Sequence, residues 1–218
     1  MPGPLTAPDD ATEQDKLDKN RRRDEETRVR ETILRVIGTH LDRSRAADSG
    51  WHQNDFDFTG AELPAVQMSS IRLEGRFDAS EATFSGAVLF VDARFDGPAR
   101  FHGAMFSEET WFTWATFSGG AYGGADFDGA TFSGDAKFDG ATFSGDTTFD
   151  GATFSGDTDF DGATFSGNAT FDGATFTKTP SVERGTISGR LIRTDGAGEE
   201  ASRPGEERPF QPSVVPWS

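Results

Sequence analysis

The sequence contains no cysteine, which excludes disulfide bonds and thiolate metal sites. Hydrophobic residues make up only 34% of the 218 residues, and the first apolar run is too short and too charged for a signal peptide or a membrane span. Lys and Arg number 21 against 37 Asp and Glu, and the formal charge of −16 disfavours direct nucleic-acid binding while permitting a basic partner. We therefore expect a soluble, cytoplasmic protein with no membrane attachment.

Phenylalanine, in contrast, is abundant and regularly spaced. Of the 21 Phe residues, 20 lie between residues 56 and 176, and from Phe127 to Phe176 the steps between them alternate between five and six residues. Each eleven-residue repeat holds two pentads, such as ATFSG and AKFDG, and one extra residue; the extra residues are Asp135, Asp146, Asp157 and Asn168. A fixed short period of this kind indicates a solenoid, because no single repeat can bury its own apolar face.

The glycine two residues after each Phe from Phe127 to Phe171 indicates the type of solenoid. In a helix each such glycine would cost about 1 kcal/mol relative to alanine, whereas a type II turn needs a residue with positive φ at its third position. A turn every five residues leaves only two or three extended residues per side. Four sides then close a square coil of about 22 residues, with Phe and the small residue two before it pointing inward. The sequence thus predicts an all-β solenoid of about six coils.

Two irregularities interrupt the repeat. The register slips around Phe77 and Phe84. Between Phe117 and Phe127 the spacing is ten residues, with Tyr122 midway, and we therefore predict a coil that is one residue short.

The segments outside the repeat complete a four-part organisation. We predict a disordered lead at residues 1–11, a helix and linker at 12–50, the repeat solenoid at 51–193, and a disordered tail at 194–218. The helix is expected to pack an apolar face over the open N-terminal end of the solenoid and so to cover the edge of the first coil. That predicted face consists of Val29, Ile33, Val36, Ile37 and Leu41.

The pentad Ala-Thr-Phe-Ser-Gly resembles the Ala-(Asp/Asn)-Leu-X-X unit of pentapeptide-repeat proteins, with Phe as the central residue. The resemblance covers about residues 56–192 and implies a right-handed quadrilateral β-helix, and the N-terminal helix predicted above would be its capping α-helix. The helix followed by WHQNDFDFTGAEL also resembles an arrangement in actinobacterial pentapeptide-repeat proteins, where membrane-spanning helices often precede it. No such span is present here, and the resemblance implies no particular activity.

The residues that catalysis or metal binding would require are not grouped in the sequence. His40, His52 and His102 are the only histidines, and a lone surface role is expected for His102. The serines that follow Phe have no histidine placed as a base, and the repeated carboxylates define no pocket. The SGDT corners lack the spacing of calcium-binding repeats. We predict no enzyme activity, no cofactor and no metal.

The acidic residues of the repeats allow a different hypothesis. The segment from Gly119 to Thr177 contains ten Asp and one Lys. Its negative charge per unit length of the predicted solenoid is close to that of duplex DNA. The predicted acidic face comprises Asp128, Asp139, Asp150, Asp161 and Asp172. Some pentapeptide-repeat proteins mimic DNA to protect DNA gyrase, and the resemblance extends that alternative to this chain. The other interpretation is that these aspartates keep a Phe-cored rod soluble.

One coil carries outward apolar residues where later repeats have Thr, Lys or Asp. Leu89 and Trp111 are 22 residues apart and are expected to stack, while Trp114 and Met105 project from a corner and a neighbouring face. Apolar patches of this kind often mark interfaces, although the N-terminal helix or the tail would also cover such a patch. We favour a non-catalytic protein-binding or scaffold module over the DNA mimic. A partner protein with a basic groove and a homodimer are both compatible with this hypothesis. An ice-binding role through stacked threonines such as Thr131, Thr153 and Thr175 is disfavoured by the crowding of Asp and Ser.

Overall fold

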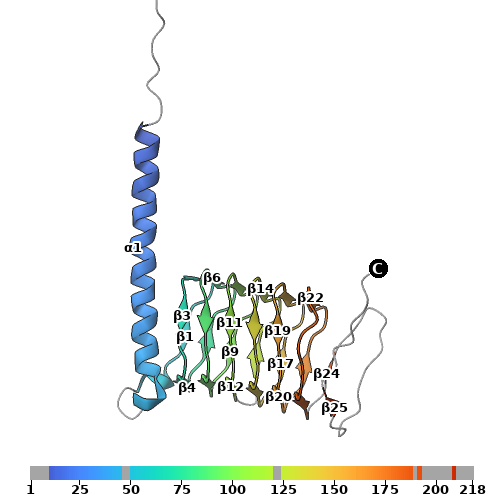
Figure 1. Ribbon diagram of the computed structural model, residues 1–218. Coiled ribbons are helices and arrows are strands. Elements are labelled where there is room, and N and C mark those ends of the chain that lie inside the picture. Colours follow the sequence, from blue (N-terminus) through green and yellow to red (C-terminus); the bar gives the residue numbers. More distant parts are fainter. Residues whose placement is uncertain (1–9, 46–49, 120–123, 189–190, 193–207, 210–218) are drawn as a thin grey trace, which may run out of the picture.

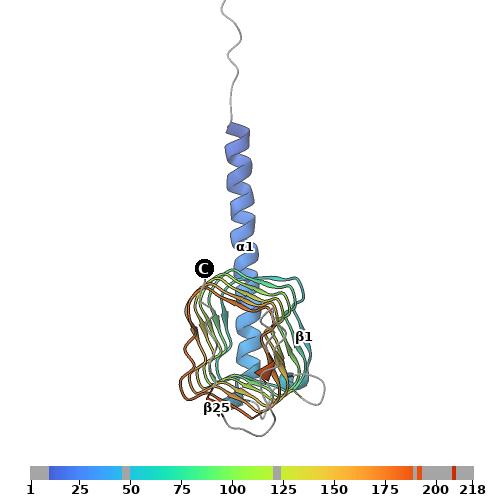
Figure 2. The same ribbon diagram turned by 90° about the vertical axis from the view of Figure 1, so that its right-hand side faces the viewer.

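The computed structural model describes residues 10–45, 50–119, 124–188, 191–192 and 208–209. The helix α1 (Asp10–Leu41) comes first, followed by the 3-10 helices η1 (Arg43–Arg45) and η2 (Trp51–Gln53). Two-residue strands then wind into a solenoid of about six coils with four parallel sheets as its sides (Figures 1 and 2). The predicted quadrilateral solenoid with an N-terminal helix is confirmed.

The first two sides of the coil are sheets 1 and 2. Sheet 1 contains β1 (Phe56–Asp57), β5 (Phe77–Asp78), β9 (Ala99–Arg100), β13 (Ala125–Asp126), β17 (Thr147–Thr148), β21 (Ala169–Thr170) and β24 (Leu191–Ile192). Sheet 2 contains β2 (Glu62–Leu63), β6 (Thr83–Phe84), β10 (Met105–Phe106), β14 (Thr131–Phe132), β18 (Thr153–Phe154) and β22 (Thr175–Phe176).

The other two sides are sheets 3 and 4. Sheet 3 contains β3 (Val66–Gln67), β7 (Val88–Leu89), β11 (Thr110–Trp111), β15 (Ala136–Lys137) and β19 (Thr158–Asp159). Sheet 4 contains β4 (Arg72–Leu73), β8 (Arg94–Phe95), β12 (Thr116–Phe117), β16 (Thr142–Phe143), β20 (Thr164–Phe165), β23 (Thr186–Ile187) and β25 (Arg208–Pro209). Strand β25 pairs antiparallel with β23 and lies in the predicted disordered tail. The rest of that tail, and the lead up to residue 9, lie outside the described residues.

The core is a set of stacked phenylalanine rings. Phe149 lies between Phe127 and Phe171, with ring centroids 4.9 and 4.8 Å apart and nearly parallel planes. Four such columns fill the coil: Phe101–Phe127–Phe149–Phe171, Phe84–Phe106–Phe132–Phe154–Phe176, Phe90–Phe112–Phe138–Phe160 and Phe95–Phe117–Phe143–Phe165. Small inward residues such as Ala136 and Thr147 are buried between the columns, as the pentad pattern predicts.

The coil length varies at two places. Regular coils stack residues 22 apart, as in the pair Asp135 and Asp157, and the first coil is one residue shorter, since Asp55 contacts Arg76 with a separation of 21. At the wide gap between Phe117 and Phe127 the prediction of a shortened coil is wrong. Thr113 contacts Asp139 with a separation of 26, so this coil is four residues longer than the rest. Phe101 stacks on Phe127 in the same register. Tyr122 lies outside the described residues.

The two types of repeat glycine have different structural roles. Gly151, in the Phe-Asp-Gly half of its repeat, has a φ of 64°, as predicted for the turn. The φ of Gly156, in the Phe-Ser-Gly half, is not positive. A Cβ added to Gly156 would lie 2.4 Å from the carbonyl oxygen of Gly134 in the preceding coil. Gly134 and Gly167, in the same half of their repeats, are equally close to the preceding coil, so these glycines are required for close stacking of coils rather than for turn geometry.

Helix α1 crosses the N-terminal end of the solenoid and continues well beyond it (Figures 1 and 2). Its 32 residues correspond to a length of about 48 Å, and its C-terminal turns pack against β2, β3 and η2. The predicted packing face is partly wrong: Val29, Ile33 and Val36 are exposed. The residues that cover the coil are Leu34, Ile37 and Leu41, which also recur at helical spacing.

Candidate functional site

The four apolar residues singled out in the sequence lie on sheets 2 and 3 and at the corner that follows sheet 3, and we call them the tryptophan patch: Leu89, Met105, Trp111 and Trp114. In sheet 3, Trp111 pairs with Leu89 on one side and with Lys137 on the other, so the predicted stacking of Leu89 and Trp111 is confirmed. Met105 lies on the adjoining sheet 2, between Thr83 and Thr131. Three of the four side chains are exposed, Met105 by 48%, Trp111 by 39% and Trp114 by 63%, while Leu89 is half-buried.

Trp114 adopts an unusual backbone conformation. Its φ of 56° lies in the left-handed region, which bulky residues rarely adopt. The equivalent corner of the other coils also has positive φ and is occupied by Ser70, Asp92, Gly140, Gly162 and Arg184. Such strain costs on the order of 1–3 kcal/mol and tends to be found at functional sites. Spacing alone did not reveal this equivalence, because the long coil places Gly140 26 residues after Trp114 instead of 22.

The indole of Trp114 lies along the solenoid axis against the next coil. A Cβ added to Gly140 would lie 2.2 Å from Cδ1 and 2.7 Å from Nε1 of this indole. The five-membered ring therefore covers Gly140, and only glycine leaves room for it. Because Trp114 is still 63% exposed, most of the indole remains accessible to solvent.

Carboxylates border the tryptophan patch on both edges of sheet 3. Asp139 precedes Gly140 and its Oδ1 accepts a hydrogen bond of 2.7 Å from Oγ1 of Thr113, the residue before Trp114. Glu108 and Glu109 are exposed immediately before β11. The patch therefore combines an apolar centre with acidic edges.

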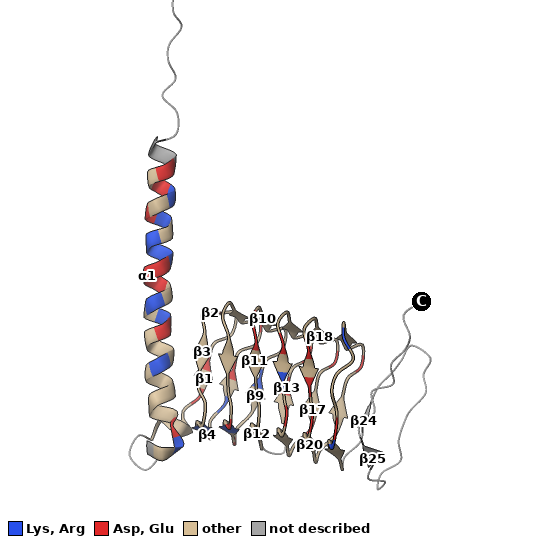
Figure 3. Cartoon of the chain, viewed as in Figure 1, with Lys and Arg blue, Asp and Glu red and all other residues tan. Residues whose placement is uncertain are grey.

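The predicted acidic residues lie at two opposite corners of the coil. Asp128, Asp150 and Asp172 precede turn glycines after sheet 1, and Asp139 and Asp161 precede turn glycines after sheet 3. The extra residues Asp135, Asp146 and Asp157 occupy the remaining two corners. The structure thus distributes the negative charge around the solenoid instead of concentrating it on one face (Figure 3).

Several of these carboxylates connect successive coils, a role that the repeat pattern alone does not indicate. Oδ1 of Asp150 accepts the backbone N–H of Asp172 at 2.7 Å, and Oδ1 of Asp135 accepts that of Asp157 at 2.8 Å. Asp146 and Asp161 accept the backbone N–H groups of Asn168 and Glu183 in the same way. These hydrogen bonds satisfy corner N–H groups and give the repeat aspartates a structural function.

The early coils hold paired charges. Asp96 is held between Arg72 and Arg94, at 2.8 and 2.6 Å. Burial alone would raise the pKa of Asp96, but the hydrogen bonds from Arg72 and Arg94 outweigh it and lower that pKa below its usual value. For Asp78, burial is likewise outweighed by hydrogen bonds from Ser80 and Arg100, and its pKa is also lowered.

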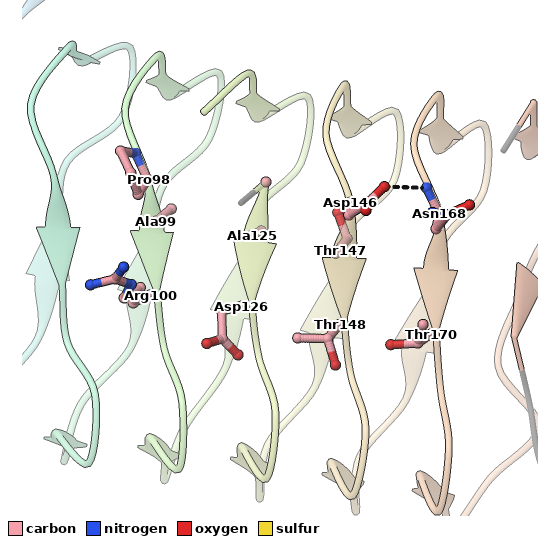
Figure 4. Close-up of a pocket in the computed structure, with 11 residues that line it drawn as sticks. Pro98, Ala99, Arg100, Ala125, Asp126, Asp146, Thr147, Thr148, Asn168 and Thr170 are labelled. Carbon is pink, nitrogen blue, oxygen red and sulfur yellow. Dashed lines mark hydrogen bonds between the residues drawn. The ribbon is translucent and has the colours of Figure 1, made fainter. Parts of the chain in front are cut away.

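A shallow groove of about 450 Å³ crosses sheet 1 (Figure 4). The residues around it are Pro98, Ala99, Arg100, Gly124, Ala125, Asp126, Asp146, Thr147, Thr148, Asn168 and Thr170. Arg100 already lies 3.5 Å from Asp78, and Asp126 accepts the backbone N–H of Asp128 at 3.0 Å. No sequence pattern predicted this groove, because it depends on the long coil, which brings Gly124 against Asp146. Arg100, Asp126 and Asp146 thus make local contacts, and the labelled side chains do not converge on a common point in Figure 4.

The histidines make separate local contacts. His102 Nδ1 is 3.6 Å from Asp128, His52 Nε2 is 3.8 Å from Glu74, and His40 stacks on Trp51. Within the part of the chain that the structure describes, no three His, Asp or Glu residues are grouped in a way that would hold a metal ion. None of the described helices combines the length and the apolar character that crossing a membrane requires.

Comparison with known families matches this repeat to one family model. The model described as pentapeptide repeats (9 copies) matches residues 79–141, 122–164 and 138–186. The matched region contains all four residues of the tryptophan patch and the aspartates of the later coils. A search of curated proteins gave no match.

Proposed function

Because the chain belongs to the pentapeptide-repeat family, we propose that it is a non-catalytic solenoid that binds another protein through the tryptophan patch. The observation that carries this proposal is Trp114. It is a large, exposed aromatic residue in a backbone conformation that glycine occupies in the next two coils. The fold itself does not require tryptophan at this corner, since glycine serves there at Gly140 and Gly162.

The composition of the tryptophan patch fits a binding surface. Tryptophan is among the residues that contribute most to binding energy at protein interfaces. A flat solenoid side presents Leu89 and Trp111 in fixed register, so the ordering cost on binding is small. An apolar centre bordered by polar groups is the usual anatomy of an interface.

The DNA-mimic alternative needs its charge gathered on the side that a basic groove would contact. Carboxylates at all four corners, several of which accept backbone hydrogen bonds, do not meet that requirement in a single chain. The protein-binding role is therefore better supported than the DNA mimic, which stays a prediction. The homodimer and the cytoplasmic location also stay predictions.

Photo-crosslinking in cells of the source organism tests the proposal. A crosslinking residue in place of Leu89 should capture a partner, whereas one in place of Thr153, three coils further on and on sheet 2, should not. The double variant Trp111→Lys/Trp114→Gly, which introduces the residues of the next coil, should abolish the adduct while leaving far-UV circular dichroism unchanged. Capture that persists in this double variant, or that is equal at Thr153, would refute the proposal.

A further inference from the structure

The position of the Trp114 indole suggests the chemistry of the partner. One side of the five-membered ring lies against Gly140, and the residue is 63% exposed. The indole is thus a flat aromatic surface fixed on the solenoid rather than a freely rotating side chain. Such a surface attracts cations through its electron-rich face, and tryptophan is the strongest of the aromatic residues in this respect.

A carboxylate is held next to this aromatic surface. Asp139 is adjacent in sequence to Gly140, and its Oδ1 is fixed by the hydroxyl group of Thr113 at 2.7 Å. Among the described residues, no Lys, Arg or His pairs with Asp139, Glu108 or Glu109. The nearby cations already have partners, since Lys137 lies 4.0 Å from Asp159 and Arg43 pairs with Asp92. Negative charge at the tryptophan patch is therefore not neutralised within the described part of the chain.

We propose that Trp114 and Asp139 together bind a guanidinium or ammonium group of the partner, and that Leu89 and Trp111 contact an apolar side chain beside that group. This inference rests on the proposed function and specifies the partner as a protein segment that combines Arg or Lys with an apolar residue. The cation lies on the indole face while Asp139 forms the ion pair. The formal charge of −16 favours approach of such a segment and disfavours phosphate-bearing surfaces.

A designed peptide provides the test with the full-length chain. The probe is the blocked hexapeptide Arg-Leu-Arg-Arg-Leu-Arg, and its control has Glu in place of Arg. Binding is followed by ¹⁹F NMR of protein labelled with 5-fluorotryptophan, with the resonance of Trp114 assigned by the variant Trp114→Phe. The arginine peptide should shift the Trp114 resonance in a saturable manner, and the glutamate peptide should not.

Matched variants distinguish binding at this site from general electrostatic attraction of the arginine peptide to the acidic protein. Asp139→Asn and Gly140→Ala, the latter displacing the indole, should each raise the dissociation constant about three- to tenfold. The controls Asp146→Asn and Gly162→Ala make the same chemical changes away from the indole and should alter it less than about twofold. Equal effects of Asp139→Asn and Asp146→Asn, or no response of the Trp114 resonance, would overturn the inference.

The crosslinking experiment distinguishes this failure from failure of the proposed function. If Asp139→Asn leaves partner capture at Leu89 intact while Trp111→Lys/Trp114→Gly abolishes it, the patch binds a partner but the cation site is wrong. If neither variant reduces capture, the patch is not the binding surface and both proposals fall.

Discussion

The contact between Trp114 and Gly140 predicts an unequal effect of two otherwise identical substitutions. Gly140 and Gly162 occupy the same corner in successive coils, with φ values of 64° and 67°. Alanine at either position carries a left-handed conformation that costs roughly 1–2 kcal/mol. At Gly162 the added Cβ meets only ordinary contacts of 3.9 Å, but at Gly140 it would lie 2.2 Å from the indole. Gly140→Ala must therefore also displace Trp114.

The size of this additional cost follows from how much of the indole is covered. Trp114 is 63% exposed, so roughly 90 Å² of the about 250 Å² that a tryptophan side chain can bury is covered by the protein. Displacing the indole exposes this area and costs up to about 2 kcal/mol. We expect Gly162→Ala to lower the free energy of unfolding by about 1–2 kcal/mol and Gly140→Ala by about 3–4 kcal/mol.

Urea unfolding followed by far-UV circular dichroism measures both variants in the wild-type and Trp114→Asn backgrounds. Asparagine tolerates positive φ and removes the indole. In that background the cost of Gly140→Ala should fall to that of Gly162→Ala. Equal costs in the wild type, or a cost of Gly140→Ala that does not depend on residue 114, would refute the position of the indole on which the cation site depends.

Four further predictions test the rest of the structure. Phe149→Ala leaves a cavity between Phe127 and Phe171 and should cost about 3–5 kcal/mol in urea unfolding; an unchanged midpoint would contradict the inward stack. Leu34→Ala should cost about 2–5 kcal/mol and exposed Ile33→Ala less than about 0.5 kcal/mol; the reverse order would show that the helix packs through its other face. Folding lowers the pKa of Asp96 below the value of about 3.8 that it has in the unfolded chain. The ionised Asp96 therefore stabilises the fold above that pH, and this stabilisation is lost as the pH falls through the pKa of the folded state. The stability difference between wild type and Asp96→Asn should therefore shrink below about pH 4, and a constant difference would argue against the Arg72–Asp96–Arg94 cluster. If the chain mimics DNA, it should inhibit supercoiling by purified gyrase at low salt, and the triple variant Asp128→Asn/Asp150→Asn/Asp172→Asn should not; absence of inhibition at micromolar protein removes gyrase as a target.

The fold could be predicted from the repeat because the residue types in each pentad determine its local backbone geometry. An inward Phe, a small residue two before it and a glycine two after it allow few arrangements, and the ring stack of Phe127, Phe149 and Phe171 follows from the period. The pairing of Leu89 with Trp111 was also accessible, because both lie within regular coils. Spacing therefore sufficed wherever the coil length was constant.

Prediction failed where a local change altered the register or where two interpretations had equal support. The ten-residue gap after Phe117 fits either a missing residue with Tyr122 inward or four added residues, and only the stacking of Phe101 on Phe127 decides between them. Because the length of this coil could not be predicted, the contact between Trp114 and Gly140 could not be predicted either. In α1, the stripe that contains Leu34 and the stripe that contains Ile33 both have helical spacing. Only the position of the helix on the end of the solenoid determines that Leu34 is buried and Ile33 is exposed.

The aspartates and the tryptophans of this solenoid thus require different explanations. Acidity alone suggested a DNA mimic, yet Asp135, Asp146 and Asp150 each accept a backbone N–H from the following coil, so stacking already accounts for a carboxylate at these corners. Within the described part of the chain the side chain of Trp114 makes no such hydrogen bond, and its contact with the following coil is with Gly140. Glycine occupies the equivalent corner in the next two coils without the cost of a left-handed tryptophan, and the indole leaves most of its surface in solvent. The equivalent corners of the other coils hold Ser, Asp, Gly or Arg, and a tryptophan that presents an aromatic face beside Asp139 is better explained by a contact outside this chain.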